Sequence, residues 1–368
     1  MNMKLKILSV VGTRPEFIRA NAMSRALRER HCEVLLNTGQ HYDREMSSIF
    51  FEELGVPPPE ISLGIGSDTH GAQTGALLTA IERVLLNERP DAVVVHGDTN
   101  STLAGGLAAV KLHIPVIHVE AGLRSFNKLM PEEINRIVVD HVSSLWLCPS
   151  EIAAENLRRE GIVENVRIVG DLMADALHLA SARAKLTSRI LTQLGLSPQR
   201  FLLATVHRAE NTDDLDRLSQ ILEAFIEVDE EIIFPVHPRT RHCMTLIGDE
   251  LFNRVNKSRI RLVDPLGYLD MLMLEQSARM ILTDSGGIQK EAYWLGVPCV
   301  TLRDETEWVE TVINGWNILV GANKERIISA VKTFVPQPFR PPLYQSDGNT
   351  AARCVVEIER FMVSRLRR

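Results

Sequence analysis

The segment LKILSVVGTRPEFIR, residues 5–19, decides the fold class of this chain of 368 residues. Its apolar run, residues 7–11, is too short for the core of a signal peptide and leads directly into a Gly-Thr-Arg-Pro turn. A short apolar run that ends at turn residues is typical of a buried strand. Pro15 suits the first turn of a helix, and Glu16 suits the positive end of the helix dipole. The segment therefore predicts a strand, a tight turn and a helix.

The same alternation continues along the chain in two series. Strand-like runs of the first series cover residues 5–11, 33–36, 92–95, 116–119 and 145–147, with helix-like runs at 18–28, 75–86 and 103–112. The second series begins near residue 166, with strand-like runs at 166–169, 201–205, 232–235, 260–263, 280–282 and 299–302. Apolar strands that alternate with helices indicate parallel sheets covered on both faces. We predict an α/β protein with two Rossmann-like, doubly wound domains that face each other across a cleft.

Three further segments complete this organisation. Residues 174–194 are predicted to be helical and to carry the crossing between the domains. The proline-rich run 336–348 is predicted to be a surface loop, and a final helix covers 350–368. In doubly wound sheets, ligands bind outside the carboxyl ends of the strands. The residues that follow each strand are therefore the candidates for a functional site.

Composition and charge exclude several classes of function. The chain has 41 Lys and Arg against 47 Asp and Glu, a net charge of −6, so a nucleic-acid partner or a basic membrane surface is not expected. No apolar stretch reaches the roughly 18 residues that a membrane span needs. The five cysteines are scattered without C-x-x-C spacing, which predicts ordinary thiols in a reducing compartment. The histidines form no metal-binding motif, and we predict no metal site.

Two acidic residues follow neighbouring strand-like runs. Asp98 ends the run AVVVHGDT and Glu120 ends PVIHVEAG. One strand–helix–strand step would bring both carboxylates to the same edge of the sheet. Paired carboxylates in a partly dry site can serve as one acid and one base. Asp98 alone could instead cap the next helix, but two acids at equivalent positions favour acid–base chemistry.

A third acid is predicted near the same edge. Glu132, in the motif MPEEINR, follows the loop 124–130 that leaves from the strand of Glu120. Two glutamates at a helix start, Glu132 and Glu133, are also what the helix dipole favours. The location of the loop is what makes Glu132 a candidate.

Three groups could bind phosphate. Arg14 follows the first strand, where it either grips a phosphate or is a solvated arginine beside a capped helix. His207, in TVHRAEN, ends a strand of the second series. The strongest signal is LTDSGGIQKEA, where Ser285, Gly286 and Gly287 expose backbone N–H groups at a helix start and form an anion cradle. The simpler interpretation of this motif is a glycine-rich helix cap.

Taken in order, these motifs resemble the non-hydrolysing UDP-N-acetylglucosamine 2-epimerases over essentially the whole chain. The resemblance rests on GTRPEFIR, HGDT, HVEAGLRS, PEEINR, VHRAEN, PVHPR and LTDSGGIQKEA. It implies a glycosyltransferase-B-like fold with a C-terminal helix that returns to the first domain. Residues 1–169 with 350–368 would form the N-terminal domain, and residues 170–349 the UDP-binding domain.

The resemblance also implies a role for each site residue. It assigns catalysis to Asp98, Glu120, Glu132 and His207, and substrate binding to Arg14, Arg19, His207, Met271, Ser285, Gly286, Gly287 and Glu291. Glu291 would bind the ribose and Met271 would lie near the uracil, while Arg19 stands where the family usually has lysine. The implied reaction removes the C2 proton as UDP leaves C1, and UDP then adds back to the glycal. It needs no cofactor and no metal. The family is expected to be cytoplasmic and homodimeric.

The sequence departs from well-known bacterial members of that family in two places. Where those members read RDTTERPE, residues 303–310 read RDETEWVE, so Trp308 replaces a substrate-contacting arginine. A tryptophan could stack on the sugar, or it could pack in the core with Arg303 turned inward. The loop 40–46 and Ala72 lack residues that bind a second substrate molecule in those members.

These departures leave alternatives open. The variant motifs also resemble a relative that acts on UDP-2,3-diacetamido-2,3-dideoxyglucuronate. More distant alternatives are a glycosyltransferase of the same fold, a hydrolysing epimerase and a non-catalytic sensor of sugar nucleotides. The three acids favour proton chemistry over glycosyl transfer.

Overall fold

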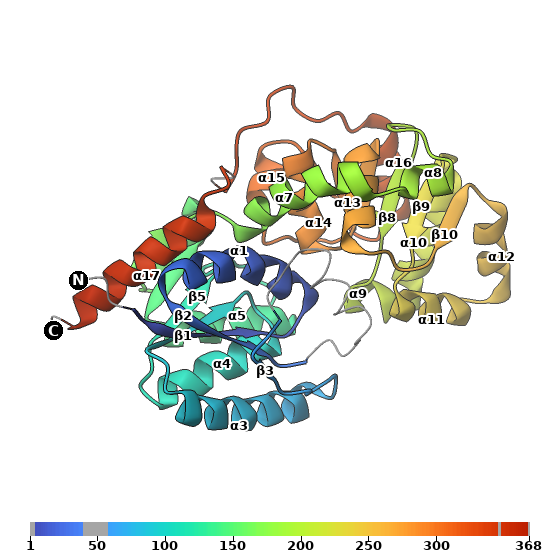
Figure 1. Cartoon of the computed structure of the whole chain (residues 1–368). Helices are drawn as coiled ribbons and strands as arrows, with labels where there is room; N and C mark the ends of the chain where they lie inside the picture. Colours follow the sequence, from blue (N-terminus) through green and yellow to red (C-terminus); the bar gives the residue numbers. More distant parts are fainter. Residues whose placement is uncertain (1–3, 40–57, 345–346, 367–368) are drawn as a thin grey trace. The chain divides into compact units, whose positions relative to one another are not determined.

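The protein contains two compact units, each built on one parallel sheet. The structure, a computed structural model, describes residues 4–39, 58–344 and 347–366. Unit 1 comprises Met1–Leu179 with Pro342–Arg368, and unit 2 comprises Ala180–Pro341. Figure 1 shows strands alternating with helices in both units. The predicted fold class, α/β with two Rossmann-like doubly wound domains, is confirmed.

Unit 1 has a seven-stranded sheet in the order β3-β2-β1-β4-β5-β6-β7. Its strands are β1 (Lys6–Val11), β2 (Cys32–Asn37), β3 (Ile61–Ser62), β4 (Ala92–His96), β5 (Val116–Val119), β6 (Leu145–Cys148) and β7 (Val166–Ile168). Its helices are α1 (Arg14–Arg30), α3 (His70–Glu88), α4 (Asn100–Lys111), α5 (Pro131–Val142), α6 (Glu151–Arg159), α7 (Leu172–Thr187, which runs on into unit 2) and α17 (Thr350–Leu366). The strand order reverses between β1 and β4, which is where such sheets bind ligands.

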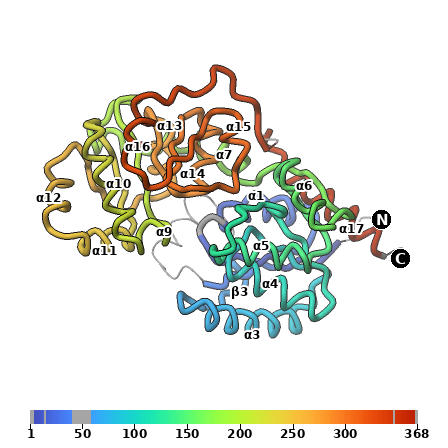
Figure 2. The backbone as a smooth tube through the Cα atoms, turned by 180° about the vertical axis from the view of Figure 1, so that it is seen from behind, coloured from blue at the N-terminus to red at the C-terminus, as the bar shows by residue number. Residues whose placement is uncertain are grey.

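Helices cover both faces of this sheet because successive strand residues point to opposite sides. Ile7 faces a core cluster with Met23 and Leu27 of α1 and Ile358 of α17. Its neighbour Leu8 faces the other cluster, to which α3, α4 and α5 contribute. In Figure 1, α1 and α17 lie on one side of the sheet and α3 and α4 on the other, and Figure 2 shows α5 beside α4 from behind. The central strands β1, β4 and β5 are therefore buried on both faces, as their continuous apolar runs predict.

Unit 2 repeats the plan with six strands in the order β10-β9-β8-β11-β12-β13. Its strands are β8 (Leu202–Thr205), β9 (Ile232–Pro235), β10 (Ile260–Val263), β11 (Met280–Thr283), β12 (Cys299–Thr301) and β13 (Asn317–Leu319). Its helices are α8 (Ile190–Leu194), α9 (Ala209–Thr212), α10 (Leu215–Val228), α11 (Pro238–Leu246), α12 (Asp249–Lys257), α13 (Tyr268–Ser277), α14 (Gly286–Leu295), α15 (Val309–Ile313) and α16 (Lys324–Thr333). Here the strand order reverses between β8 and β11.

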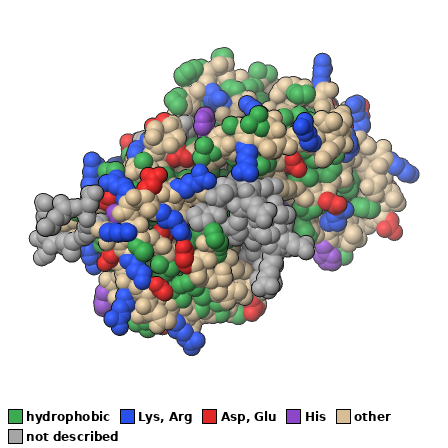
Figure 3. Space-filling view, in the orientation of Figure 1, with side chains coloured by type: hydrophobic (Ala, Val, Ile, Leu, Met, Phe, Trp, Pro, Cys, Tyr) green, Lys and Arg blue, Asp and Glu red, His purple; other side chains and the backbone are tan. Residues whose placement is uncertain are grey.

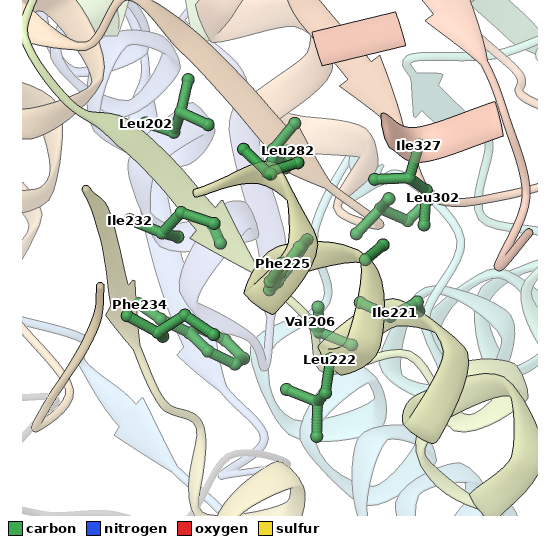
Figure 4. Close-up of a cluster of buried hydrophobic side chains, with 14 of the residues drawn as sticks. Leu202, Val206, Ile221, Leu222, Phe225, Ile232, Phe234, Leu282, Leu302 and Ile327 are labelled. Atoms are coloured by element: carbon green, nitrogen blue, oxygen red, sulfur yellow. The ribbon is translucent and has the colours of Figure 1, made fainter. Parts of the chain in front are cut away.

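The core on one face of the sheet of unit 2 is mostly aliphatic and contains one pair of aromatic rings. Phe225 of α10 and Phe234 of β9 meet edge to face, with ring centroids 6.0 Å apart. Figure 4 shows Leu202, Ile232 and Leu282 from neighbouring strands gathered around this pair. This packing holds the ends of β8 and β11 in register, where the sequence places His207 and the glycine-rich cradle.

Three differences from the predicted elements have simple causes. Val166–Ile168, which the pattern assigns to the second series, pairs with β6 and ends the sheet of unit 1, so that prediction was wrong. The predicted helix 174–194 is interrupted at Ser188 and Arg189, which separate α7 from α8. The short edge strands β3 and β13 were not predicted, because two or three residues give too little periodicity to detect.

The surface and the cysteines agree with the composition. On the face drawn in Figure 3, basic and acidic side chains are interspersed. All five cysteines are free thiols, and burial raises the pKa of Cys299 to about 12. Within the described part of the chain, the helices are too short or too polar to cross a lipid bilayer.

Candidate active site

The turn after β1 is packed too closely to admit a side chain at its glycine. A Cβ atom at Gly12 would overlap the hydroxyl oxygens of Thr38 and Ser101, which are hydrogen-bonded to each other at 2.8 Å. Thr13 caps α1, so the helix begins at Arg14. The structure places the backbone of Arg14 where the sequence predicts it, at the strand end beside the switch point.

Glu16 ties this turn to the turn after β4. Its carboxylate accepts hydrogen bonds from the backbone of Gly12 (2.6 Å) and Thr13 (2.9 Å), and from the hydroxyls of Thr99 (2.7 Å) and Thr102 (3.1 Å). Burial raises the pKa of Glu16, and these donors offset only part of that effect. The buried Glu16 carboxylate therefore links the turn after β1 to the turn after β4.

Asp98 does not cap the helix that follows it. Thr99 is the capping residue of α4, and its side chain accepts from the backbone of Thr102. The Asp98 carboxylate instead forms an ion pair with Arg136 of α5. Asn135 donates to the backbone oxygen of Asp98 at 3.0 Å. Asp98 is therefore not the capping residue of α4. Its side chain, 27% exposed, is held beside Arg136.

Glu120 is held in a backbone conformation that few residues other than glycine adopt. Its φ is 69°, in the left-handed region, directly after β5. Its carboxylate forms an ion pair with Arg19 of α1, and both side chains are more than nine-tenths buried. Strained backbone of this kind costs about 1–3 kcal/mol and concentrates at functional sites.

Asp98 and Glu120 lie at the ends of adjacent, directly paired strands. His96 of β4 stands opposite Val119 of β5, and the backbone of Gly97 donates to Val119 at 3.0 Å. The two acids follow this pair by two residues and one residue respectively. The structure thus brings them to one edge of the sheet, each with its own arginine.

Glu132 and Glu133 have different roles although they are adjacent. Glu133 is fully buried and its carboxylate accepts from the backbone of Ser125 (3.0 Å) and Phe126 (2.9 Å). It therefore fixes the loop that connects β5 to α5. Glu132 is half-buried in the first turn of α5.

Arg136 is a site residue that the motif analysis did not assign. Its guanidinium contacts Glu133 at 2.6 Å and also forms the ion pair with Asp98. It lies three residues after Glu133 and four after Glu132, a spacing that places all three on neighbouring positions of one helix surface. This spacing is the feature of the sequence from which a contact between Arg136 and the two glutamates could have been predicted. Arg136 connects the loop anchor to the first of the predicted catalytic acids.

His96, the last residue of β4, is buried without a hydrogen-bond partner for either ring nitrogen within the residues that the structure describes. Burial, together with the nearby charges of Arg19 and His118, lowers the pKa of His96 to about 3. The folded protein therefore keeps this ring neutral, whereas the unfolded chain binds a proton near pH 6.5. The resulting stabilisation is present above pH 6.5 and is lost as the pH falls toward 3.

His96→Leu is expected to remove this pH dependence. Between pH 7.5 and 5.0, the wild type should lose about 2 kcal/mol more unfolding free energy than the variant. Hydrogen exchange of the slowest β4 and β5 amides would measure this for unit 1. His178→Leu, at an exposed histidine, is the matched control. Equal pH dependence in wild type and His96→Leu would contradict the assignment.

In unit 2, Asp284 organises the loop that carries His207. The Asp284 carboxylate is fully buried and accepts from the backbone N–H groups of His207 and Arg208, both at 2.9 Å, and from Asn211 at 3.2 Å. It also lies 3.2 Å from Nδ1 of His207. Asp284 therefore orients the ring of His207, whose side chain is 37% exposed. Asp284 lies one residue before Ser285, and no role was predicted for it from the sequence.

The glycines of the cradle have two different functions. A Cβ at Gly286 would lie 2.6 Å from Oε1 of Glu307 and 3.1 Å from Nε1 of Trp308, so packing requires this glycine. Among the residues that the structure describes, a Cβ at Gly287 would have only Oγ of Ser285 within 4 Å, at 3.8 Å. Ser285 caps α14 by accepting from Ile288. Both interpretations of the motif therefore apply: it is a helix cap, and it leaves an open helix N-terminus suited to an anion.

The residues predicted to contact the nucleoside lie on two adjacent helices. The hydroxyl of Tyr268 on α13 donates to Oε1 of Glu291 on α14 at 2.9 Å. Met271 follows Tyr268 by one turn and is 9% exposed. The structure thus brings Glu291 and the helix of Met271 together at the start of α14.

Trp308 is buried in unit 2 and its ring is already covered. It is 4% exposed, and the ammonium of Lys290 lies 3.7 Å from the centroid of its ring. Arg303 is fully buried and pairs with Glu307 at 3.0 Å. These contacts match the packing interpretation, in which Arg303 turns inward, and leave little of the indole face for stacking on a sugar.

Part of the predicted regulatory difference lies outside the described residues. The structure does not describe the loop 40–46. Of the positions named for this difference it describes only Ala72, which is exposed in the first turn of α3.

Comparison with known proteins places these features in a family. Residues 25–359 match the family described as UDP-N-acetylglucosamine 2-epimerase. The UDP-N-acetylglucosamine 2-epimerase of Methanocaldococcus jannaschii is 50% identical over 89% of this chain and 92% of its own length. The UDP-2,3-diacetamido-2,3-dideoxy-D-glucuronate 2-epimerase of Pseudomonas aeruginosa is 48% identical over 96% of this chain and 99% of its own length.

A solved structure extends the likeness to the fold. The Methanocaldococcus jannaschii enzyme in complex with UDP-GlcNAc and UDP is 46% identical, has a TM-score of 0.89, and covers 97% of this chain and 100% of its own. The likeness includes both sheets and the connections between their strands.

Proposed function

This chain belongs to the UDP-N-acetylglucosamine 2-epimerase family, and we propose that it interconverts UDP-N-acetylglucosamine and UDP-N-acetylmannosamine without hydrolysing them. It is therefore an isomerase. The observation that carries the proposal is the edge of unit 1, where Asp98 and Glu120 end adjacent strands and each carboxylate is held by an arginine. Inversion at a carbon by proton exchange needs two acid–base groups, one for each face of the sugar.

In this proposal, unit 1 supplies the acid–base groups. Asp98, Glu120 and Glu132 act on the C2 proton, and Arg136 and Arg19 fix the orientation of the first two. The left-handed backbone of Glu120 supports this role, because a strained catalytic residue is kept where the fold over-determines it.

Unit 2 holds UDP in this proposal. Ser285, Gly286 and Gly287 form the cradle for the diphosphate at the start of α14, and the N–H groups of the two glycines face it, because the N–H of Ser285 donates to Oγ1 of Thr283 at 2.9 Å. Glu291 binds the ribose hydroxyls. His207, oriented by Asp284, contacts the diphosphate and assists departure of UDP. Arg14 contributes charge to the same diphosphate, and Met271 borders the uracil.

The reaction then proceeds in two balanced steps. A carboxylate removes the C2 proton, the C2–H electrons form the C1=C2 double bond, and the C1–O bond breaks so that UDP leaves with its electron pair. UDP then adds back to C1 of the glycal while a carboxylic acid delivers a proton to the opposite face of C2. Preorganised donors around the diphosphate favour the charge that develops on departing UDP.

Turnover in D2O is expected to place deuterium at C2 of the sugar. The C2 proton passes to a carboxylate in each cycle and exchanges there with solvent. The experiment incubates the protein with UDP-N-acetylglucosamine, without added metal or nicotinamide, and follows the C2 proton and the anomeric signals by NMR. Inversion with the original C2 hydrogen retained would rule out this mechanism, and release of free sugar would indicate a hydrolysing enzyme.

A second candidate substrate has support of its own. The relative from Pseudomonas aeruginosa acts on a diacetamido-uronate, and Trp308 removes an arginine that well-known members place near the substrate. The buried Lys290–Trp308 and Arg303–Glu307 pairs fill that position instead. We keep UDP-N-acetylglucosamine as the first choice, because its 2-epimerase from Methanocaldococcus jannaschii is as similar to this chain.

The choice between the two sugars is tested by kcat/KM for both compounds. We expect measurable epimerisation of UDP-N-acetylglucosamine, with a preference of less than about 100-fold for the uronate, which corresponds to about 2.7 kcal/mol. A larger preference for the uronate would overturn the first choice and leave the mechanism standing. Trp308→Arg shows whether position 308 sets the preference.

We also propose that the enzyme is a homodimer in the cytoplasm. The free thiols of all five cysteines support a reducing compartment. The homodimer follows from the family resemblance, and light scattering coupled to size-exclusion chromatography tests it directly.

A further inference from the structure

His118 of β5 is a buried histidine with an acceptor at each end of its ring. Its Nε2 lies 2.7 Å from the carbonyl oxygen of Gly97, and its Nδ1 lies 2.7 Å from Oδ1 of Asp140. The ring and the Asp140 carboxylate are both fully buried. Neither contact is part of the acid–base roles assigned above, although Gly97 immediately precedes Asp98.

The partners of the ring leave it no acceptor role. A carbonyl oxygen only accepts hydrogen bonds, so Nε2 must carry a proton to contact Gly97 at this distance. Oδ2 of Asp140 accepts from Arg124 at 2.7 Å and from the backbone of Gly122 at 3.2 Å. The buried guanidinium of Arg124, with the backbone of Gly122, holds Asp140 as an ionised carboxylate without any contribution from His118. Nδ1 of His118 must therefore also donate.

We propose that His118 is an imidazolium, held by Asp140, that acts as a positioning residue for Asp98. Its Nε2–H fixes the Gly97 carbonyl, and so fixes the turn from which Asp98 projects. The proposal rests on the proposed function in one respect, namely that Asp98 acts on the substrate.

The surroundings of Gly97 show why this contact matters. The residue has φ of 66°, and a Cβ there would lie 3.0 Å from the guanidinium of Arg19. The next carbonyl, that of Asp98, accepts from Asn135 at 3.0 Å. Two consecutive carbonyls are therefore fixed from different elements, β5 and α5. Catalytic groups need support of this kind to hold their orientation.

A neutral ring could not support the same geometry. With its single proton on Nδ1 toward Asp140, the lone pair of Nε2 would face the lone pairs of the Gly97 oxygen. With the proton on Nε2, the lone pair of Nδ1 would face the carboxylate. Asp140 contacts the ring, Arg124 pairs with Asp140 at 2.7 Å, the guanidinium of Arg19 lies beside Gly97, and His96 on the neighbouring strand stays neutral. One carboxylate shared by two cations thus maintains both contacts.

The first test observes the ring directly. Nitrogen-15 NMR of protein labelled at histidine, without substrate at pH 7.5, should show one histidine with protons on both ring nitrogens. Loss of that signal in His118→Gln assigns it. A neutral tautomer at His118 would overturn the proposal, whatever reaction the protein catalyses, because this readout does not depend on activity.

The second test uses a matched pair of amide substitutions. In His118→Gln the amide nitrogen takes the place of Nε2 and can donate to Gly97, whereas in His118→Asn the shorter amide reaches only toward Asp140. We expect His118→Asn to lower kcat by roughly 100-fold with KM and UDP affinity unchanged, and His118→Gln to stay within about 10-fold of wild type.

Equal losses of kcat in the two variants would show that the ring serves only folding and would overturn the positioning role. Hydrogen exchange detects whether both variants fail to fold. In that case the protonation of the His118 ring in the wild type, observed by nitrogen-15 NMR, decides whether the proposal stands. If the wild type lacks epimerase activity altogether, the proposed function fails, and the protonation of His118 is still settled by the spectrum.

Discussion

Replacing any one of Asp98, Glu120 and Glu132 by its amide is expected to lower kcat by about 10²–10⁴-fold, the usual effect of removing a positioned acid or base. The amides of Asp98→Asn, Glu120→Gln and Glu132→Gln keep the size of the side chain but cannot take up or release the C2 proton. The affinity for UDP should change little, because none of the three acids is proposed to bind UDP, and apart from Arg14 the residues proposed to bind it lie in unit 2. The measurement pairs kcat for epimerisation with the Kd for UDP from calorimetry.

The chain provides a control for the amide series. Glu151→Gln changes an exposed acid in the first turn of α6 and should leave kcat unchanged. Glu120→Gln also leaves Arg19 without its buried carboxylate, so its folding must be checked separately. Near-normal turnover in all three site variants would contradict the assignment of the acids.

Arg136→Met is expected to have the largest effect on stability, lowering the unfolding free energy of unit 1 by about 3–5 kcal/mol. The guanidinium contacts both Asp98 and Glu133, and the side chains of Arg136 and Glu133 are 4% and 1% exposed. Removing it leaves the Glu133 carboxylate buried without its cation. Catalysis should fall as well, since Asp98 loses the group that orients it. Hydrogen exchange of the unit 1 strands measures the first effect and kcat the second.

Arg158→Met is the matched control for this prediction. Arg158 also pairs with a glutamate three residues away on a helix, but both of those side chains are exposed. Exposed pairs contribute little, so no measurable change is expected. Arg136→Lys should be intermediate, because an ammonium cannot make the forked contacts of a guanidinium to two carboxylates. A loss in Arg136→Met no larger than in the control would show that the pair does not stabilise unit 1.

Much of the fold could be predicted because its strands are buried on both faces. Such strands appear in the sequence as unbroken apolar runs, and β5 and β9 begin and end where those runs do. The assignment of Val166–Ile168 failed because a run of three or four residues shows that a strand exists but not which sheet it joins. The pairing partner is decided by tertiary packing, to which local sequence gives no access.

The site was predicted in part for a related reason. Residues at strand ends, such as Asp98, Glu120 and His207, can be located because parallel strands place their carboxyl ends at one edge. Arg136 and Asp284 were missed because their importance lies in their partners: one contacts two acids from α5, and the other fixes the His207 loop. Partners distant in sequence become visible only when the chain is folded.

The division of unit 1 into two chain segments has a consequence for synthesis on the ribosome. Unit 1 is built from two separate stretches of chain, and unit 2 is inserted between them. The late stretch contributes α17, whose Cys354, Val355 and Ile358 are almost completely buried against the sheet together with side chains of α1.

A nascent chain that has been translated to residue 341 therefore contains the whole of unit 2 but lacks the helix that covers part of one face of the first sheet. Domains generally fold as units during synthesis. In this protein, the stretch made first must wait with apolar strand residues uncovered while the inserted unit emerges, and it completes its core only when the final helix is released. The order of synthesis and the order of folding are thus reversed: the second unit made is the first that can be finished.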